Sequence, residues 1–408
     1  MNAPMLDSAE AIRAYVLENL AGLGFPVNDG EILHEDLSKD TVRGLHSLHR
    51  AEFLRKNAEL VDKHLDDIAP FFADGVEIDP CKIDPFIRPV LTELDGALFR
   101  AATMLWSVPV SQGYGRRNRF LVCDRQNGAL IGVYALGDPV FNLAVRDRLI
   151  GWDARDREHR LYQCFDAFVL GAVPPYRELL GGKAVALCAI SNETRRFLEK
   201  KYAGVITKIR EQEKPSTPVL ITTTSALGRS SIYNRIKIGK RTLFYSVGYT
   251  EGFGHFHIPE QLFAAFVAYL DSIGSLPGNS YGNGPNYRMR VTRTALTELG
   301  LNPELMRHGV RREVFLAPVA HNWREVLRGE ETQVDRMDLP LACLGEFYAA
   351  RWAFPRSMRD ARYKAVTNAE TMSAIRPAVG ITPTMLGRRY TRDIAISRFR
   401  LEDLQSSP

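Results

Sequence analysis

A stretch rich in serine, threonine and arginine has the residue types that bind an anion. It reads TTTSALGRSSIYNRI and covers 222–236. Arg229 follows a glycine in a turn, and its guanidinium group suits bidentate contact with phosphate, with the Ser230 hydroxyl beside it. The alternative is that Ser225 or Ser230 only caps a helix that begins near Ser231. The stretch predicts either an anion site or a helix cap.

A second run, PPYRELLGGKAV at 174–185, offers cations beside a glycine pair that precedes a predicted helix. Backbone N–H groups at the start of a helix attract anions. Arg177 and Lys183 could therefore line a central anion-binding cleft together with the arginine of the first stretch. The alternative for Gly181 and Gly182 is close packing between a helix and a strand, or a break in the helix.

The segment GYTEGFGHFHI (248–258) brings two histidines close to a glutamate, Glu251. If this segment is a strand, His255 and His257 share a face, because side chains two apart point to the same side. They are weak candidates for acid/base catalysis, as are Glu251 and Tyr233. We expect no metal, because a His-x-His pair without a third placed ligand is a weak signal. The sequence contains no Walker loop, G-x-S-x-G elbow or HExxH motif.

Arginine is concentrated at 288–312, a composition that favours phosphate contact. The first two of these arginines share a face if the segment is extended. Alternatively the last one lies in a buried polar network, paired with Glu313 or Asp335. The arginines proposed to contact nucleic acid are Arg288, Arg290, Arg293 and Arg312.

The C-terminal part is also basic. Residues 351–400 hold eleven Lys/Arg against three Asp/Glu, a balance of +8, while the whole chain has a net charge of +5. Aromatic residues are interleaved with these cations, a combination that suits phosphate contact and base stacking. The alternative is an ordinary solvated face.

The elements that must position these residues can be predicted from hydrophobic periodicity and turn residues. The first part of the chain is helical, with a long helix at about 41–69. Asn127-Gly128 joins two β-rich runs, a strong hairpin signal. A buried strand is expected at 164–173, a helix at 179–202 and a further strand at 218–227.

This order predicts an α+β fold in three regions. They are a helical N-terminal region (1–95), a central mixed β-sheet with its helices (96–275), and an Arg-rich C-terminal region (276–408) that ends as a basic extension. The length of 408 residues and the 45% apolar content fit a soluble protein of two or three units. No long uncharged apolar run is present, so we expect a cytoplasmic protein without a membrane partner. The five scattered cysteines are expected to be free thiols.

The central layout resembles the core of the GCN5-related N-acetyltransferases, in which a strand, a glycine-containing turn and a helix bind the pyrophosphate of acyl-coenzyme A. The resemblance implies that Arg177, Gly181 and Gly182 contact the pyrophosphate, with Tyr233 or His255 as acid or base. Three residues separate Arg177 from Gly181, whereas the acetyltransferase pattern has two.

Five longer strings carry a second resemblance: LGDPVFNLAVRDRLIGWDARDREHRL, DAFVLGAVPPYRELLGGKAVALCAI, TTTSALGRSSIYNRI, GYTEGFGHFHI and HGVRREVFLAPVAHN. Together, over roughly 40–355, they resemble the DruA family of the Druantia anti-phage defence system. The resemblance implies a bacterial defence protein that works beside a large helicase-like protein and other subunits, and that has dealings with DNA. It brings no agreed catalytic residues.

Three functions follow as hypotheses. The first is a defence-system component that contacts DNA or RNA through the arginine-rich segments, with no cofactor. The second is an N-acyltransferase that uses acyl-coenzyme A. The third is a structural adaptor for other defence subunits.

Overall fold

The computed structural model describes residues 6–23, 25–28, 31–32, 38–111, 114–206, 211, 213, 217–251, 254–278 and 287–376. Contacts divide the chain into two compact units. Unit 1 comprises Met1–Phe53, Ser107–Pro109 and Glu251–Arg311, and unit 2 comprises Leu54–Trp106, Val110–Thr250 and Arg312–Pro408. The expected division at residues 95 and 275 stays a prediction. The second half of the basic C-terminal extension lies outside the described residues.

Unit 1 is mostly helical among its described residues. Helix α1 packs against α10, and α10 packs against α11, along apolar faces that include Val16, Phe266 and Leu296. The bounds are α1 (Ala9–Gly22), β1 (Val27–Asn28), β2 (Glu31–Ile32), α2 (Lys39–Gly44), α10 (Glu260–Ser272), α11 (Tyr287–Glu298) and η5 (Pro303–Met306).

The long helix expected at 41–69 is broken into pieces. Helix α2 ends at Gly44, α3 (Ser47–Lys63) crosses from unit 1 into unit 2, and α4 (Leu65–Ile68) follows after His64. Short 3-10 turns continue the chain at η1 (Ala69–Phe71) and η2 (Gly75–Glu77). Hydrophobic spacing alone does not reveal such breaks, because the apolar positions of successive short helices keep a near-helical period.

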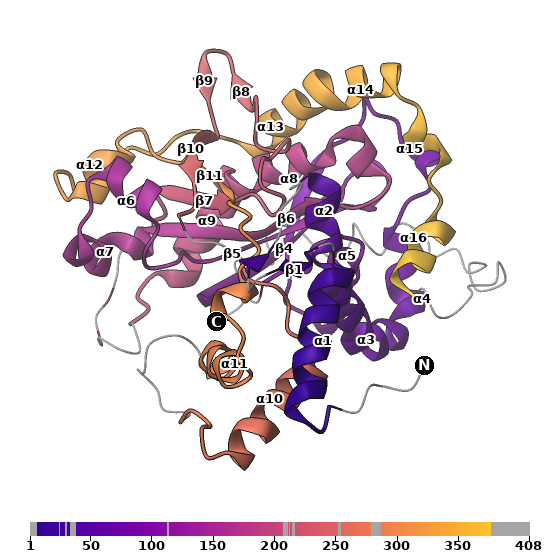
Figure 1. Cartoon of the computed structure of the whole chain (residues 1–408). Coiled ribbons are helices and arrows are strands. Elements are labelled where there is room, and N and C mark those ends of the chain that lie inside the picture. Colours follow the sequence, from indigo (N-terminus) through magenta and orange to yellow (C-terminus); the bar gives the residue numbers. More distant parts are fainter. Residues whose placement is uncertain are drawn as a thin grey trace. The chain divides into compact units, whose positions relative to one another are not determined.

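Unit 2 is built on a seven-stranded mixed sheet in the order β10-β11-β7-β6-β5-β4-β3 (Figure 1). Every neighbouring pair is antiparallel except β6 and β7, which run parallel. The strands are β3 (Pro85–Pro89), β4 (Tyr114–Asp124), β5 (Leu130–Asp138), β6 (Cys164–Ala172), β7 (Leu220–Thr224), β10 (Tyr245–Tyr249) and β11 (Glu313–Pro318). The α+β class with a mixed central sheet is confirmed.

The hairpin predicted at Asn127-Gly128 is confirmed as the β4–β5 connection. The predicted strands at 164–173 and 218–227 are β6 and β7. The helix expected at 179–202 is interrupted. After η4 (Tyr176–Leu179), α8 (Gly181–Ala189) and α9 (Asn192–Tyr202) are separated by Ile190 and Ser191, and the Ser191 side chain accepts a hydrogen bond from Thr194 N and caps α9. A serine at this position favours the start of a new helix, because its hydroxyl satisfies an N–H group of the first turn.

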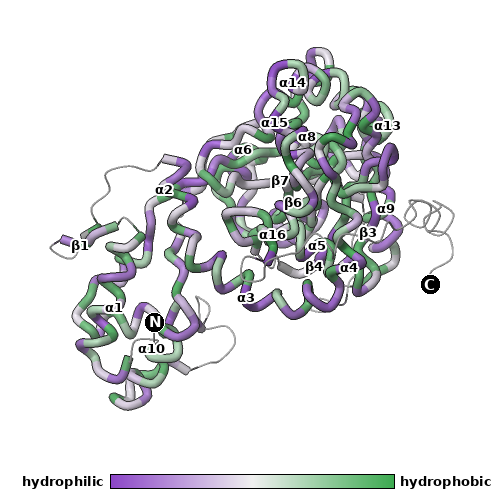
Figure 2. The backbone as a smooth tube through the Cα atoms, turned by 90° about the vertical axis from the view of Figure 1, so that its right-hand side faces the viewer, coloured by the Kyte–Doolittle hydropathy of each residue, from purple (hydrophilic) through white to green (hydrophobic). Residues whose placement is uncertain are grey.

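Two apolar clusters occupy opposite faces of this sheet. One gathers Phe165, Ile221 and Phe315 with the helices α8 and α13 (Leu341–Tyr348). The other gathers Cys164, which points the opposite way, with α6 (Ala144–Ile150) and α12 (Trp323–Arg328). In Figure 2 the central strands and α8 are largely green, the colour of hydrophobic residues.

The remaining helices of unit 2 lie around this core. They are α5 (Glu93–Met104), which contacts β4 and β5, α7 (Ala154–Arg160) with η3 (Leu161–Gln163), and a C-terminal run of η6 (Ala349–Ala353), α14 (Phe354–Arg359), α15 (Arg362–Ala365) and α16 (Asn368–Ile375). Among the described residues of the two units, no helix is both long enough and apolar enough to cross a bilayer.

Candidate functional site

The stretch that follows β7 forms a chain of turns and not the helix that the sequence predicted near Ser231. Ser230 Oγ accepts a hydrogen bond from Ile232 N at 3.1 Å, which closes a local serine turn. Asn234 Nδ2 donates to the Ser230 carbonyl oxygen. The expectation of a helix was wrong because these side-chain bonds satisfy the backbone in a turn.

A buried carboxylate holds this turn against the sheet. Glu313, at the start of β11, is 6% exposed, and its Oε2 accepts a hydrogen bond from Ser230 N at 3.0 Å. Its Oε1 accepts one from Ser246 Oγ on β10 at 2.7 Å. The Glu313 backbone also donates to the Gly228 carbonyl and accepts from Ser225 N. Glu313 therefore fixes both ends of the 225–230 turn, the Ser225 end through its backbone and the Ser230 end through its carboxylate.

The pairing expected between Arg312 and Glu313 or Asp335 is absent from the described residues. Glu313 is bound by hydroxyl and amide donors, and no ion pair joins it to Arg312. Burial lowers the pKa of the Arg312 guanidinium. A buried polar network does exist here, but with serine partners.

Lys183 holds the other end of the same loop. It lies in the first turn of α8 and is 7% exposed. Its ammonium group donates to the carbonyl oxygens of Ser231 at 3.1 Å, Ile232 at 2.7 Å and Asn234 at 2.8 Å. Burial, with a smaller contribution from Arg235, lowers the pKa of Lys183 to about 8. The structure engages this amine with backbone carbonyls of the loop.

Tyr233 is buried under the loop. Its ring stacks at 5.4 Å from that of Phe244 and lies 5.0 Å from that of Phe315, and its hydroxyl is 3.2 Å from Thr223 Oγ1. Burial raises the pKa of Tyr233 to about 12. The side chain fastens the loop to the sheet, and its role as a catalytic acid stays untested.

Of the three cations predicted to line a central cleft, only Lys183 is buried. Arg177 is exposed and forms an ion pair with its neighbour Glu178 at 3.0 Å. Arg229 is exposed at the tip of the turn fixed by Glu313. The start of α8 is crowded, because a Cβ atom on Gly182 would lie 3.3 Å from Ile232.

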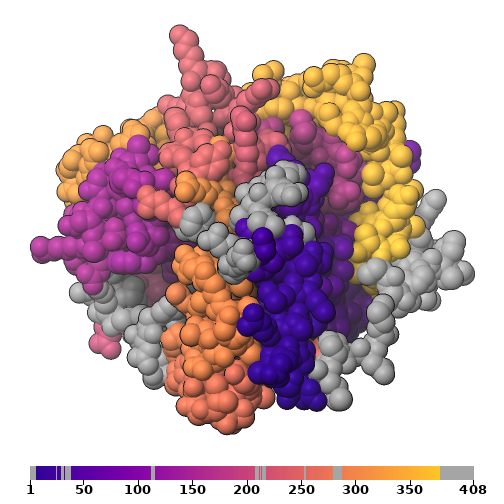
Figure 3. Space-filling model, in the orientation of Figure 1, coloured from indigo at the N-terminus to yellow at the C-terminus, as the bar shows by residue number. Residues whose placement is uncertain are grey.

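The loop continues into a basic hairpin that sequence reasoning missed. Strands β8 (Lys237–Ile238) and β9 (Arg241–Thr242) form a two-stranded hairpin that stands out from unit 2 in Figures 1 and 3. Between residues 226 and 250 the chain carries five cations and no acidic residue: Arg229, Arg235, Lys237, Lys240 and Arg241. All five are exposed. The acid-free interval was the signal that could have found this surface.

Asp166, at the centre of the sheet, is a second feature that sequence reasoning missed. Asp166 on β6 is paired in register with Thr222 on β7, whose hydroxyl donates to Asp166 Oδ1 at 2.8 Å. Burial raises the pKa of Asp166 to about 6, opposed by the Thr222 hydrogen bond and by Arg146. Beyond this pair β6 and β7 have no further paired residues. The backbone pairing of the parallel strands therefore ends at this carboxylate, and a side-chain hydrogen bond from Thr223 Oγ1 to the Ala167 carbonyl at 3.0 Å follows it.

The histidines of the predicted acid/base cluster belong to unit 1. His255 and His257 do not lie on a strand as expected, because the backbone there forms one isolated bridge, between His255 and Arg307. His257 Nε2 lies 2.9 Å from Glu52 Oε2, and its ring stacks on His49 at 4.2 Å.

Burial, followed by Arg307, lowers the pKa of His255. Glu251 is exposed. Among the described residues no group of three histidine, cysteine or acidic side chains could hold a metal ion.

The first three arginines of the 288–312 segment have partners inside unit 1. The segment begins as helix α11, so Arg288 and Arg290 do not share a face as they would in a strand. Arg288 donates to the Ile258 carbonyl and stacks on Phe263 at 4.3 Å. Arg290 donates to the Gly278 carbonyl. Arg293 is half exposed and lies 3.7 Å from Glu304.

The described part of the C-terminal basic segment, 351–376, presents exposed cations. Arg356 and Arg362 both pair with Asp360. Arg351, Arg359 and Lys364 are exposed and form no ion pair with any described residue.

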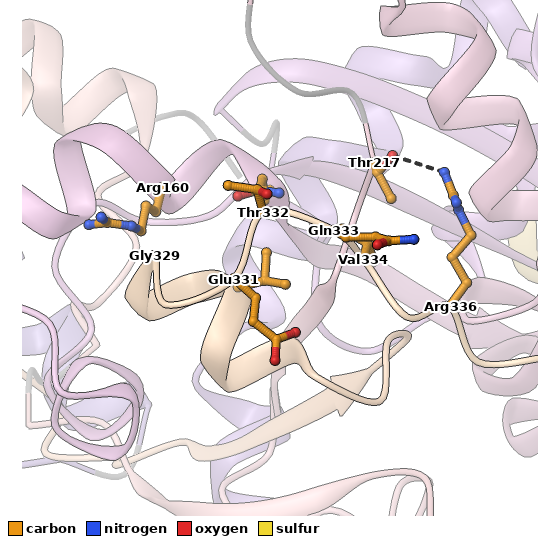
Figure 4. A pocket seen from close by; sticks show the side chains of 10 residues that line it. Arg160, Thr217, Gly329, Glu331, Thr332, Gln333, Val334 and Arg336 are labelled. Atoms are coloured by element: carbon orange, nitrogen blue, oxygen red, sulfur yellow. Dashed lines mark hydrogen bonds between the residues drawn. The ribbon is translucent and has the colours of Figure 1, made fainter.

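A surface pocket of about 500 Å³ lies elsewhere in unit 2, between the end of α12 and the turn after α7 (Figure 4). Arg336 points toward Thr217, with 3.4 Å between Nη2 and Oγ1, and also pairs with Glu199. Arg160 covers Gly329 and pairs with Asp156. Both arginines of the pocket are therefore bound by other side chains of the protein, and none of the candidate residues lines the pocket.

Comparison with known proteins decides the family. The family model described as Druantia protein DruA matches residues 36–329. The chain belongs to the DruA family. It is 44% identical, over 358 residues, to the Druantia protein DruA of Escherichia coli (strain UMEA 4076-1), covering 86% of this chain and 89% of that protein. No solved structure matches this DruA-family chain.

Family membership confirms the resemblance seen in the five sequence strings. The match to these relatives shows neither an acetyltransferase-like core nor contact with nucleic acid for this DruA-family chain.

Proposed function

We propose that this DruA-family chain is a component of an anti-phage defence system that contacts DNA or RNA and works in the cytoplasm beside other defence subunits, including a helicase-like protein. One observation carries the nucleic-acid part. The described surface of unit 2 presents exposed cations that no carboxylate neutralises, in the two segments 226–250 and 351–376.

Such cations favour nucleic acid because phosphate contact releases condensed counterions, which gives affinity without sequence readout. Surface cations that are paired with carboxylates contribute less to this effect, because their charge is already balanced. In unit 1 the arginines Arg288, Arg290 and Arg293 have partners within the protein, so they are secondary candidates.

The test is fluorescence anisotropy of labelled single-stranded and double-stranded DNA with the purified chain at about 50 and 200 mM salt. Several phosphate contacts predict an affinity loss of a hundredfold or more between these concentrations. The variant Arg351→Gln/Arg359→Gln/Lys364→Gln should reduce the salt slope. Absent binding at low salt, or binding that ignores salt, would overturn the proposal.

A second candidate is an N-acyltransferase that uses acyl-coenzyme A. It is supported by the crossover from β6 through α8 and α9 to the parallel strand β7, and by the end of the backbone pairing of β6 and β7 after Asp166 and Thr222. Strands whose pairing ends beside a helix beginning at Gly181 have the layout that the acetyltransferase resemblance implies, with Arg177 close by. Saturable binding of acetyl-coenzyme A that Gly182→Asp abolishes would support it, and no binding at millimolar concentration would contradict it.

A further inference from the structure

We propose that residues 226–250, the basic platform, form a preorganised site for single-stranded nucleic acid, with Arg229, Lys237 and Lys240 on phosphates and Tyr249 stacked under a base. This inference rests on the proposed contact with nucleic acid and names its site and its substrate class.

The exposed cations of the basic platform are not paired with carboxylates among the described residues. The platform carries five cations over 25 residues without an acidic residue. Arg241 Nη2 lies 3.3 Å from His321 Nδ1, and the other four cations form no ion pair with any described residue. Phosphates approaching this surface meet no competing carboxylate within the segment.

The part of the basic platform at 228–234 is fixed at three points, so Arg229 is presented by a defined backbone and the hairpin that carries Lys237 and Lys240 begins from an anchored loop. Glu313 binds the turn that carries Arg229, and Lys183 binds three carbonyl groups of the following residues. Tyr233 is buried between the loop and the sheet. A site ordered before binding loses less conformational entropy when the ligand arrives. These contacts therefore favour a binding surface over a loosely solvated loop.

An exposed aromatic ring lies on β10, the strand next to the one whose Glu313 binds the turn. Tyr249 on the edge strand β10 is 44% exposed and is the register partner of Glu313. Directly paired residues place their side chains on the same face of an antiparallel sheet. Tyr249 therefore shares its face with the carboxylate that holds the Arg229 turn. Tyr245 pairs with Leu316, which points to the opposite face.

The combination distinguishes single strands from other anionic partners. A ring beside cations can stack on an unpaired base while the cations bind the adjacent phosphates. A duplex keeps its bases stacked on one another and offers only phosphates to such a surface. An acidic protein segment would use the cations and gain nothing comparable from the ring. We therefore favour single-stranded DNA or RNA over both.

The experiment measures the affinity of the full chain for labelled single-stranded and double-stranded oligonucleotides over a salt series. The variant Arg229→Gln/Lys237→Gln/Lys240→Gln should lose at least tenfold in affinity, and its salt slope for single strands should fall by about 2, since each phosphate contributes about 0.7. Arg155→Gln/Lys200→Gln/Arg324→Gln is the charge-matched control, with three exposed cations from other parts of unit 2.

Stacking is tested separately. Tyr249→Ala should weaken single-strand binding roughly fivefold or more and leave duplex binding unchanged. Tyr245→Ala, a ring of similar exposure on the other face, is its control. Ultraviolet crosslinking of the unmodified chain to a single strand should label the basic platform, which keeps the inference testable if a variant fails to fold.

The outcomes distinguish a failure of the proposed function from a failure of this inference alone. No binding of the unmodified chain to any nucleic acid overturns both the proposed function and this inference. Salt-dependent binding in which the platform variant behaves as its charge-matched control overturns the inference alone. The inference is also wrong if polyglutamate competes as well as a single strand and Tyr249→Ala has no effect.

Discussion

The Nζ atom of Lys183 lies 2.7 Å from the carbonyl oxygen of Ile232, almost fifty residues further along the chain. The same amine binds two more carbonyl groups of the loop, and its position 5.3 Å from the centre of the Trp352 ring adds a cation–π contact. One side chain at the start of α8 thus fixes the path of the segment that carries the exposed cations.

Replacing Lys183 by methionine should loosen that segment. The change keeps an apolar stem of similar length but leaves three carbonyl groups without their donor, so we expect a loss of about 2 kcal/mol in the free energy of unfolding. Amide hydrogen exchange at 228–236 should also accelerate. Lys200→Met, on the exposed side of α9, is the control and should change neither quantity. Unchanged exchange in the loop would contradict a fixing role for Lys183.

Asp166→Asn should stabilise the protein in a manner that depends on pH. The folded state raises the pKa of Asp166 from 3.8 to about 6, so between these values the folded protein keeps a proton that the unfolded chain has released. Stability due to this group therefore falls as the pH rises through that window and stays low above it. Asparagine carries no such charge and still accepts from Thr222.

We expect Asp166→Asn to raise the free energy of unfolding by about 1–2 kcal/mol at pH 7.5 and to have little effect near pH 4. Urea unfolding at the two pH values measures the difference. Asp67→Asn, an exposed carboxylate on α4, serves as the control. An effect of equal size at both pH values would show that the folded state does not perturb this carboxyl group.

Arg146→Ala should be strongly destabilising. Arg146 has no exposed surface, and it donates to Asp147 at 2.7 Å and to the Val140 and Phe141 carbonyls. Removing one member of a buried ion pair leaves the other charge poorly compensated, at a loss of about 3–5 kcal/mol.

Arg157 Nη1 lies 3.2 Å from Asp147 Oδ2 and still compensates that carboxylate after Arg146→Ala. The loss in the free energy of unfolding should therefore be near the lower end of the range, about 3 kcal/mol. Chemical denaturation measures it against Arg155→Ala, an exposed arginine on α7. Equal stabilities of the two variants would refute the assignment of a structural role to Arg146.

Arg288→Ala and Arg293→Ala should separate stability from binding. Arg288 donates to a backbone carbonyl and stacks on Phe263, so its loss should lower the melting temperature of the protein and reduce its stability by about 1–2 kcal/mol. Arg293 is half exposed, and its loss should change stability by less than about 0.5 kcal/mol. If Arg293→Ala destabilises as much as Arg288→Ala, the contacts of Arg288 do not carry the stability assigned to them.

The local pattern of the chain determined four strands of the central sheet and the class of fold. Asn127-Gly128 allows the left-handed backbone of a tight turn, and the apolar runs around 164–173 and 218–227 could bury both faces, so the hairpin, β6 and β7 were predictable. The five strings that resemble the DruA family could likewise be recognised from the sequence alone. These features depend on residues that are neighbours in the chain.

Tertiary structure decided which polar groups bind other groups inside the protein and which remain exposed to a ligand. In sequence Lys183 and Arg229 are equally good anion ligands, but burial commits the first to three carbonyl groups and leaves the second exposed. Glu313 had an arginine beside it in the chain, yet it binds Ser230 and Ser246 because β11 brings them together. Desolvation makes a buried charge take whichever partners the fold supplies, and those partners are distant in sequence.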